Sequence, residues 1–207
     1  TLRVATSGIT AQGTATWTSD GSTAQFDGRV SDTSLIDARL IGPLSVQGNV
    51  DVDAASAIDA NITAQGPGGL DAVVSGRVGP SDQGQPTTAS ATLMVDNLGV
   101  FSGIAGRDIG GAARIETQIT GTLEDRALRA TVTGTTETLV IGSAEINPIL
   151  RGAGSILATI EHSASGAITI QDLIAMTPAV GVTAQARVAG DTAQSYDVDV
   201  TINAKDL

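Results

Sequence analysis

Side chains able to do acid–base or metal chemistry are sparse, and the first candidates are Glu161 and His162. A carboxylate beside an imidazole can act as a general acid–base pair. His162 is the only histidine, and there is no cysteine. A histidine-rich metal site, a thiolate site and a cysteine nucleophile are therefore excluded. We interpret His162 as a polar residue at a strand end, next to Ser163.

Two pairs of carboxylates are the second candidates. Asp51 and Asp53 stand two residues apart, as do Asp197 and Asp199. Paired carboxylates can bind calcium or hydrolyse a glycosidic bond. Neither pair belongs to an EF-hand loop or to a glycine-rich calcium-binding repeat. We expect both pairs to lie on the solvated face of strands.

The remaining motifs have structural explanations. The triplet 61–63 fits a glycosylation sequon, with Asn61 facing outward, but so short a motif arises often by chance. Gly106–Gly111 lacks the Lys-Ser/Thr of a phosphate loop and is interpreted as a corner between strands. Trp17, Phe26 and Phe101 are predicted to lie in a core or to line a groove. The sequence therefore predicts no enzyme, with no catalytic residue, metal or cofactor.

The elements that position these residues are predicted to be strands. Apolar and polar residues alternate over 9–17, 49–54, 58–64, 113–120, 128–133, 182–188 and 196–204. This period of two is typical of strands with one buried face. Turn residues separate the runs, at 19–21, 66–69, 79–82, 165–166 and 190–191. Their spacing indicates antiparallel neighbours, on the order of 15 strands, in one elongated segment over 1–207.

The predicted fold is all-β, a long curled antiparallel sheet forming a trough with an apolar concave interior. Open sheets rarely exceed about ten strands, so we expect it to curl, close into a barrel or split. Two stretches depart from the alternation and predict one or two short helical turns. The first is 96–106, where Asp96 could cap the turn. The second is 145–152, with Pro148 in its first turn and Gly152 at its end.

Composition excludes several partners. The net charge is −11, so nucleic acid and electrostatic docking on anionic lipid head groups are disfavoured. Aromatic residues are only 2%, so burial must come from Val, Ile, Leu and Ala. The sequence contains no run of 18 apolar residues, which is the length needed to span a bilayer. The chain starts at Thr1 without a signal peptide, and we expect it to be a fragment of a larger protein.

One region carries a resemblance to a known family. Val95–Leu98 is an aspartate–leucine turn, and Phe101–Gly111 adds an Ala-Gly-Arg corner and a double glycine before an amphipathic strand. This resembles the TamB family, the inner-membrane subunit of the translocation and assembly module, and the wider AsmA-like group. The segments 145–152, 168–173 and 182–190 continue the pattern, so the resemblance is clearest over about 89–190.

The resemblance implies a trough-shaped sheet (β-taco) with a hydrophobic groove. It implies a place in the periplasm of a diderm (Gram-negative) bacterium, within a protein anchored in the inner membrane. The implied roles are bridge-like phospholipid transport to the outer membrane and assembly or secretion of outer-membrane proteins and autotransporters. The implied partners are phospholipid acyl chains, an outer-membrane assembly β-barrel protein and its client strands. No catalytic residues carry over from this family.

The residues expected to line the groove, for lipid or for a client strand, are the inward-facing apolar positions of the alternation. They are Val50, Val52, Ile58, Ile62, Val74, Val78, Leu93, Val95, Ile115, Ile119, Leu128, Val132, Ile156, Ile160, Ile168, Ile170, Val182, Val188, Val198, Val200 and Ile202.

Two other functions fit parts of the pattern. A structural or adhesive β-repeat on a bacterial surface, such as an autotransporter passenger, shares the low aromatic content and the acidic balance. It differs in geometry, because a passenger β-helix is parallel with stacked rungs. An enzyme would need a pocket bringing His162 together with two carboxylates.

Overall fold

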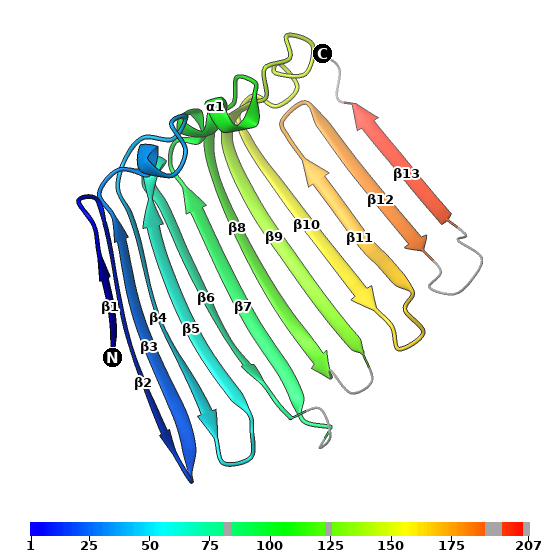
Figure 1. The fold of residues 1–207 in the computed structure, drawn as a ribbon. Helices are drawn as coiled ribbons and strands as arrows, with labels where there is room; N and C mark the ends of the chain where they lie inside the picture. The colour runs from blue at the N-terminus through cyan, green and yellow to red at the C-terminus, as the bar shows by residue number, and fades with distance from the viewer. Residues whose placement is uncertain (81–83, 123–125, 189–195, 205–207) are drawn as a thin grey trace.

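The computed structural model describes residues 1–80, 84–122, 126–188 and 196–204. The predicted turn at 190–191 and part of the one at 79–82 lie outside these residues. Thirteen strands form one antiparallel sheet in which every strand pairs with its neighbours in sequence (Figure 1). The strands are β1 (Leu2–Ala5), β2 (Ile9–Thr18), β3 (Gly21–Val30), β4 (Leu44–Asp53), β5 (Ile58–Gly66), β6 (Leu70–Val78), β7 (Pro86–Val95), β8 (Gly110–Thr122), β9 (Ala127–Val140), β10 (Ala153–His162), β11 (Ile168–Met176), β12 (Val180–Val188) and β13 (Tyr196–Ala204).

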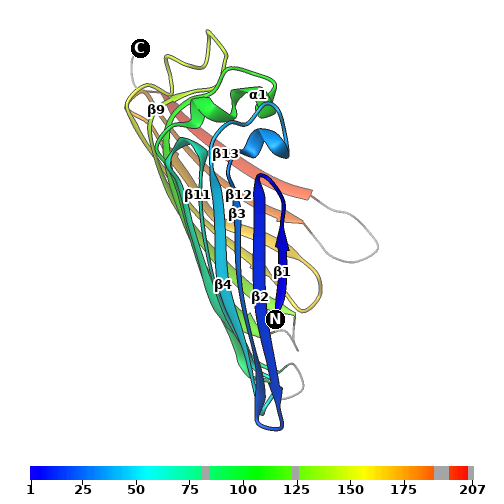
Figure 2. The ribbon, with the colours of Figure 1, turned by 60° about the vertical axis from the view of Figure 1, so that its left-hand side comes forward.

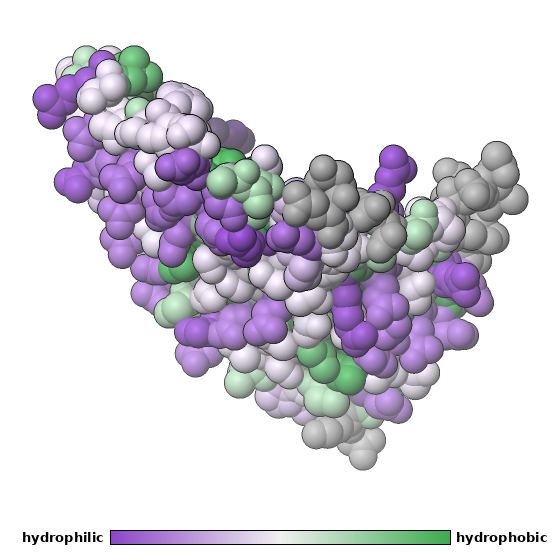
Figure 3. All heavy atoms as spheres, turned by 90° about the horizontal axis from the view of Figure 1, so that it is seen from below, coloured by the Kyte–Doolittle hydropathy of each residue, from purple (hydrophilic) through white to green (hydrophobic). Residues whose placement is uncertain are grey.

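The all-β antiparallel prediction is confirmed, and each alternating run falls in a strand. The sheet does not close, because β1 and β13 each pair on one side only within the described residues. It does not split into two sheets either. Seen along the strands, the molecule has a broad V-shaped outline (Figure 3). The apolar concave interior of the prediction stays a prediction.

The connections at one end of the strands are long and carry the helical turns. They include the 3-10 helices η1 (Thr33–Leu35), η2 (Pro67–Gly69) and η4 (Leu98–Phe101), and the short helix α1 (Ser102–Ala105). We call residues 31–43, 66–69, 96–109 and 141–152 the collar. Figures 1 and 2 show its helical turns gathered at this end of the sheet. The opposite end, the hairpin end, carries short turns such as Ser19-Asp20 and Ala54–Ala57.

The first predicted helical stretch is confirmed with one correction. Asn97, not Asp96, caps η4, since its side chain accepts a hydrogen bond from the backbone N–H of Gly99 at 2.9 Å. The second stretch is wrong as a helix. Residues 144–150 form turns in which the N–H of Asn147 bonds to the carbonyl of Ser143 and that of Leu150 to the carbonyl of Ile146. Isolated bonds of this kind do not repeat into a helix.

Neighbouring parts of the collar touch one another. The backbone N–H groups of Asp96 and Asn97 donate to the carbonyl of Gly68, at 3.0 and 2.9 Å. Gly103 lies against Arg39, where an added Cβ would sit 3.1 Å from the Arg39 Cβ. The collar segments 31–43, 66–69 and 96–109 are therefore held together by contacts with one another.

Thr33 and Asp32 hold the collar segment 31–43. Thr33 is 1% exposed, and its hydroxyl donates toward the carbonyl oxygens of Leu40 and Gly42, at 3.1 and 3.0 Å. Asp32 accepts hydrogen bonds from the backbone N–H groups of Ser34 and Gly42, at 2.9 and 3.2 Å, and these bonds lower its pKa.

A conventional core is missing from the described residues. Apart from Pro67 and Pro80, the buried apolar side chains there are limited to Ala57, Val95, Ala158 and Ala167. The accessible surface is 12776 Å², against about 8,900 Å² expected for a compact monomer of this mass. The molecule is therefore a single layer with both faces open. No helix among the described residues is long and apolar enough to cross a membrane.

Replacing Thr33 by Val should lower the free energy of unfolding by about 1–2 kcal/mol, because two buried carbonyl groups lose their shared hydroxyl donor. Urea unfolding followed by circular dichroism measures it. The control is Thr14→Val on exposed strand β2, which should change little. Equal effects of the two substitutions would contradict this account of Thr33.

Acid should weaken the collar. A bidentate bond from Arg39 lowers the pKa of Asp37 to about 2. Because the folded pKa of Asp37 and of Asp32 lies below the unfolded value of about 3.9, their contribution is complete above that pH and fades as the pH falls toward 2. The melting temperatures of the native chain and of the double variant Asp32→Asn, Asp37→Asn should differ at pH 6 and converge by pH 2. A difference independent of pH would contradict this.

Candidate functional site

The strand register aligns apolar residues into continuous rows across the sheet. Residues directly opposite one another on paired strands share a face. The first row is the row that lies one step from Val95 toward the hairpin end. It holds one residue from each of the thirteen strands. They are Val4, Ala11, Gly28, Val46, Ala64, Ala72, Leu93, Ile115, Gly134, Ile156, Ala175, Val182 and Ile202.

The second and third rows repeat this composition on the same face. The second row is Leu2, Gly13, Phe26, Gly48, Ile62, Val74, Ala91, Thr117, Val132, Ala158, Leu173, Ala184 and Val200. The third row is Ala15, Ala24, Val50, Ala60, Gly76, Ala89, Ile119, Ala130, Ile160, Ile170, Ala186 and Val198. Thr117 is the single polar residue of these three rows.

A fourth row, the hairpin row, lies nearest the hairpin end and is mixed. It contains Trp17, Ser22, Val52, Ile58 and Val78, and farther along Leu128, His162, Ile168 and Val188. The four rows and Val95, which lies at the collar, belong to one face of the sheet, which we call the apolar face. Every residue predicted to line a groove therefore lies on this face. That they line a groove stays a prediction.

A bulge in β11 keeps the face continuous. Ile170 pairs with Ile160 and Leu173 with Ala158, so two residues of β11, Gln171 and Asp172, stand opposite Thr159 alone. The extra residue shifts the alternation from even to odd positions. Leu173 thereby returns to the apolar face, which a strict period of two would not predict.

The apolar face is open to solvent. Ile58, Val74, Leu93, Ile115, Ile156, Ile168, Val198, Val200 and Ile202 are all 37% exposed or more. Thirteen strands span about 60 Å, and the four rows rise about 20 Å along the strands, giving about 1,200 Å². The largest apolar patch on a typical monomer is about 300–600 Å². A surface of this size marks an interaction site.

Glu161 and His162 do not meet. As neighbours in β10 they project to opposite faces, so they are not an acid–base pair. The His162 Nδ1 lies 2.7 Å from the carbonyl oxygen of Arg126, and Glu161 accepts a hydrogen bond from Arg129 at 3.1 Å. His162 ends its strand as predicted. Its position on the apolar face was missed, although its spacing from Ile160 carried that signal.

The carboxylate pair at 51 and 53 is held by cations and amides on the polar face. Asp53 accepts hydrogen bonds from the backbone N–H groups of Ala57 and Ala55, each at 2.9 Å. It also pairs with Arg77 at 2.9 Å. The Ala57 bond in particular lowers the pKa of Asp53. Asp51 accepts from the side chain of Asn49 at 2.9 Å.

One member of the second pair, Asp197, faces a cation. Asp197 lies opposite Arg187 and Asp199 opposite Gln185. Within the part of the chain that is described, no three His, Cys, Asp or Glu side chains gather as a metal site would require. The interpretation of both pairs as solvated strand residues agrees with this geometry.

The sequon residue, the glycine corner and the aromatic residues lie in different parts of the structure. Asn61 is exposed on β5, and Gly106 ends α1 with a φ of 65° just before β8. Trp17 and Phe26 belong to the apolar face, whereas Phe101 lies in η4, at the collar.

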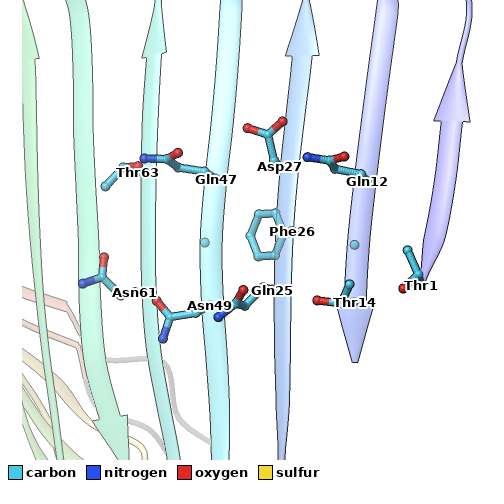
Figure 4. Close-up of a pocket in the computed structure, with 12 residues that line it drawn as sticks. Thr1, Gln12, Thr14, Gln25, Phe26, Asp27, Gln47, Asn49, Asn61 and Thr63 are labelled. Carbon is cyan, nitrogen blue, oxygen red and sulfur yellow. The ribbon is translucent and has the colours of Figure 1, made fainter. Parts of the chain in front are cut away.

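Several hollows formed by the described residues lie on the polar face. One of about 630 Å³ is lined by side chains that include Gln12, Gln25, Gln47, Asn49 and Asn61. Figure 4 shows these amide groups on neighbouring strands. The hollow over β1–β5 is thus polar, opposite in character to the predicted groove.

The native chain should bind the dye ANS, because its apolar face is exposed while its sheet is intact. Ile115→Asp should reduce the ANS fluorescence, since it places a charge in the first row. Gln118→Asp, on the polar face of the same strand, is the control. If both variants keep the far-ultraviolet circular dichroism and bind ANS equally, the apolar face is not the dye site.

Comparison with protein families, with curated proteins and with solved structures finds no match. The similarity to the TamB family therefore rests on the residues of 89–190 alone.

Proposed function

We propose that this chain is a non-enzymatic segment of a periplasmic bridge, whose apolar face carries phospholipid acyl chains between the inner and outer membranes. The observation that carries the proposal is the set of three rows that cross the sheet and are apolar at every position except Thr117. These rows run perpendicular to the strands, so a guest would travel along the length of the sheet.

The energetic need for such a surface is large. Exposing an acyl chain to water costs about 0.8 kcal/mol per CH₂, or about 12 kcal/mol for a chain of about 16 carbons. That is a factor near 10⁹ in population. A continuous apolar track about 60 Å long lowers this barrier without chemistry.

The lining suits movement rather than tight binding. Ala, Val, Ile, Leu and Gly dominate the rows, and a polar side chain occurs only at Thr117 in the first three. A smooth aliphatic surface offers acyl chains similar contacts at each step, so no position becomes a trap. The absence of a covering layer from the same chain, among the described residues, also supports a guest.

A polypeptide cargo has one observation in its favour. Strands β1 and β13 are edges of the sheet, and free edges pair with extended segments. A client strand of an outer-membrane protein fits that chemistry. The autotransporter-passenger alternative is disfavoured, because its stacked parallel rungs differ from this antiparallel sheet.

Native mass spectrometry of the purified chain should detect bound phospholipid, and the chain should speed lipid transfer between donor and acceptor vesicles. The double variant Ile119→Asp, Val198→Asp should lower the transfer rate at least about tenfold. Neutralising one buried aspartate at pH 7 costs about 4 kcal/mol, which an acyl chain must overcome to pass.

The matched control is Gln118→Asp with Gln185→Asp, on the exposed polar face of β8 and β12. It adds the same charge and should leave transfer within about twofold of the native rate. Equal transfer by both double variants, or no lipid on the native chain, would overturn the proposal. Binding of an unfolded outer-membrane strand without lipid would favour the polypeptide cargo.

A further inference from the structure

The two ends of the apolar face differ in how far they are covered. At the collar end, Val95 is 5% exposed, whereas Leu93 in the same strand is 37% exposed. The collar therefore covers the margin of the face. Its exposed side chains include the apolar Leu35, Ile36 and Ile104, at 57%, 66% and 43%, together with charged ones elsewhere in the collar.

The hairpin end is amphipathic instead. Its row contains Trp17, which is 77% exposed, together with Ser22 and His162. Of the turns beyond it, Ser19-Asp20 and Ser163–Ser165 are polar, whereas Ala54–Ala57 is mostly alanine. Tryptophan with one polar atom on an apolar ring favours the level of lipid head groups over the hydrocarbon interior.

The height of the face fits one lipid leaflet. From Val46 in the first row to Val52 in the hairpin row the strand advances six residues, or about 20 Å. The hydrocarbon core of a bilayer is about 30 Å thick, so the acyl chains of one leaflet occupy about 15 Å. Acyl chains aligned with the strands would fill the three apolar rows and place the glycerol near the hairpin row.

We propose that phospholipids lie on this face with their acyl chains along the strands, chain ends toward the collar and head groups at the hairpin end. This inference rests on the proposed function, which requires only that lipid binds. All head groups then emerge along one long side of the sheet, and the collar closes the other side against water.

Trp17 is the only tryptophan, so its fluorescence reports on the hairpin row directly. The chain is loaded with phosphatidylcholine carrying a nitroxide either on the head group or near the end of an acyl chain. The head-group nitroxide should quench Trp17 at least about twofold more than the chain-end nitroxide. In the variant Trp17→Phe, Leu93→Trp the order should reverse, because Leu93 lies in the first row, beside the collar.

The variant Trp17→Phe, Val46→Trp tests the same row if the first variant does not fold. Equal quenching by the two lipids at both positions, or the opposite order, would overturn the orientation while lipid binding stands. No quenching by either lipid, with acrylamide still quenching Trp17, would instead overturn lipid binding itself and the orientation with it.

Discussion

The cross-strand hydrogen-bond register is the constraint on which the rest of this structure depends. Slipping one strand by one residue would send its whole apolar set to the other face. Twelve consecutive pairings keep the same parity, and the bulge opposite Thr159 restores it where the sequence changes phase. The three apolar rows, interrupted only by Thr117, exist because none of these pairings slips.

A single-layer sheet with this register leaves its apolar face unpaired. Stable domains normally bury such a face against a second layer. Here the described residues provide only the collar, which covers the margin at Val95 and leaves Ile115, Val74 and Val198 open. The stability of the molecule in water is therefore coupled to whatever occupies the face, because any ligand that binds the folded state alone also stabilises it. Under the proposed function, the surface that binds the guest is also the surface whose exposure limits stability.

Much of this could be predicted from local alternation. Residues 49–64 and 113–133 alternate plainly because each strand has one wet face, and their assignment to strands needed no tertiary information. The face on which His162 lies was harder to predict. Its polar side chain suggested the polar face, whereas its even spacing from Ile160 indicated the apolar face. Leu173 could not be placed, because a bulge is set by pairing with β10 and not by β11 alone. The collar contacts, such as Gly103 on Arg39, join residues far apart in sequence and leave no local signal. The cap was predicted at Asp96 and not at Asn97 because both neighbouring side chains carry an oxygen that can accept the capping hydrogen bond.

The sequence-ordered arrangement of the strands has an evolutionary consequence. Within the sheet, each hairpin pairs only with the hairpins before and after it, so duplication of one hairpin would lengthen the sheet by about 10 Å and leave the other strand pairings unchanged. Such growth would extend all the apolar rows together, provided that the inserted hairpin keeps its apolar residues on the same face. A molecule built this way can be matched to the width of a compartment by counting hairpins, much as solenoids gain reach by adding repeats.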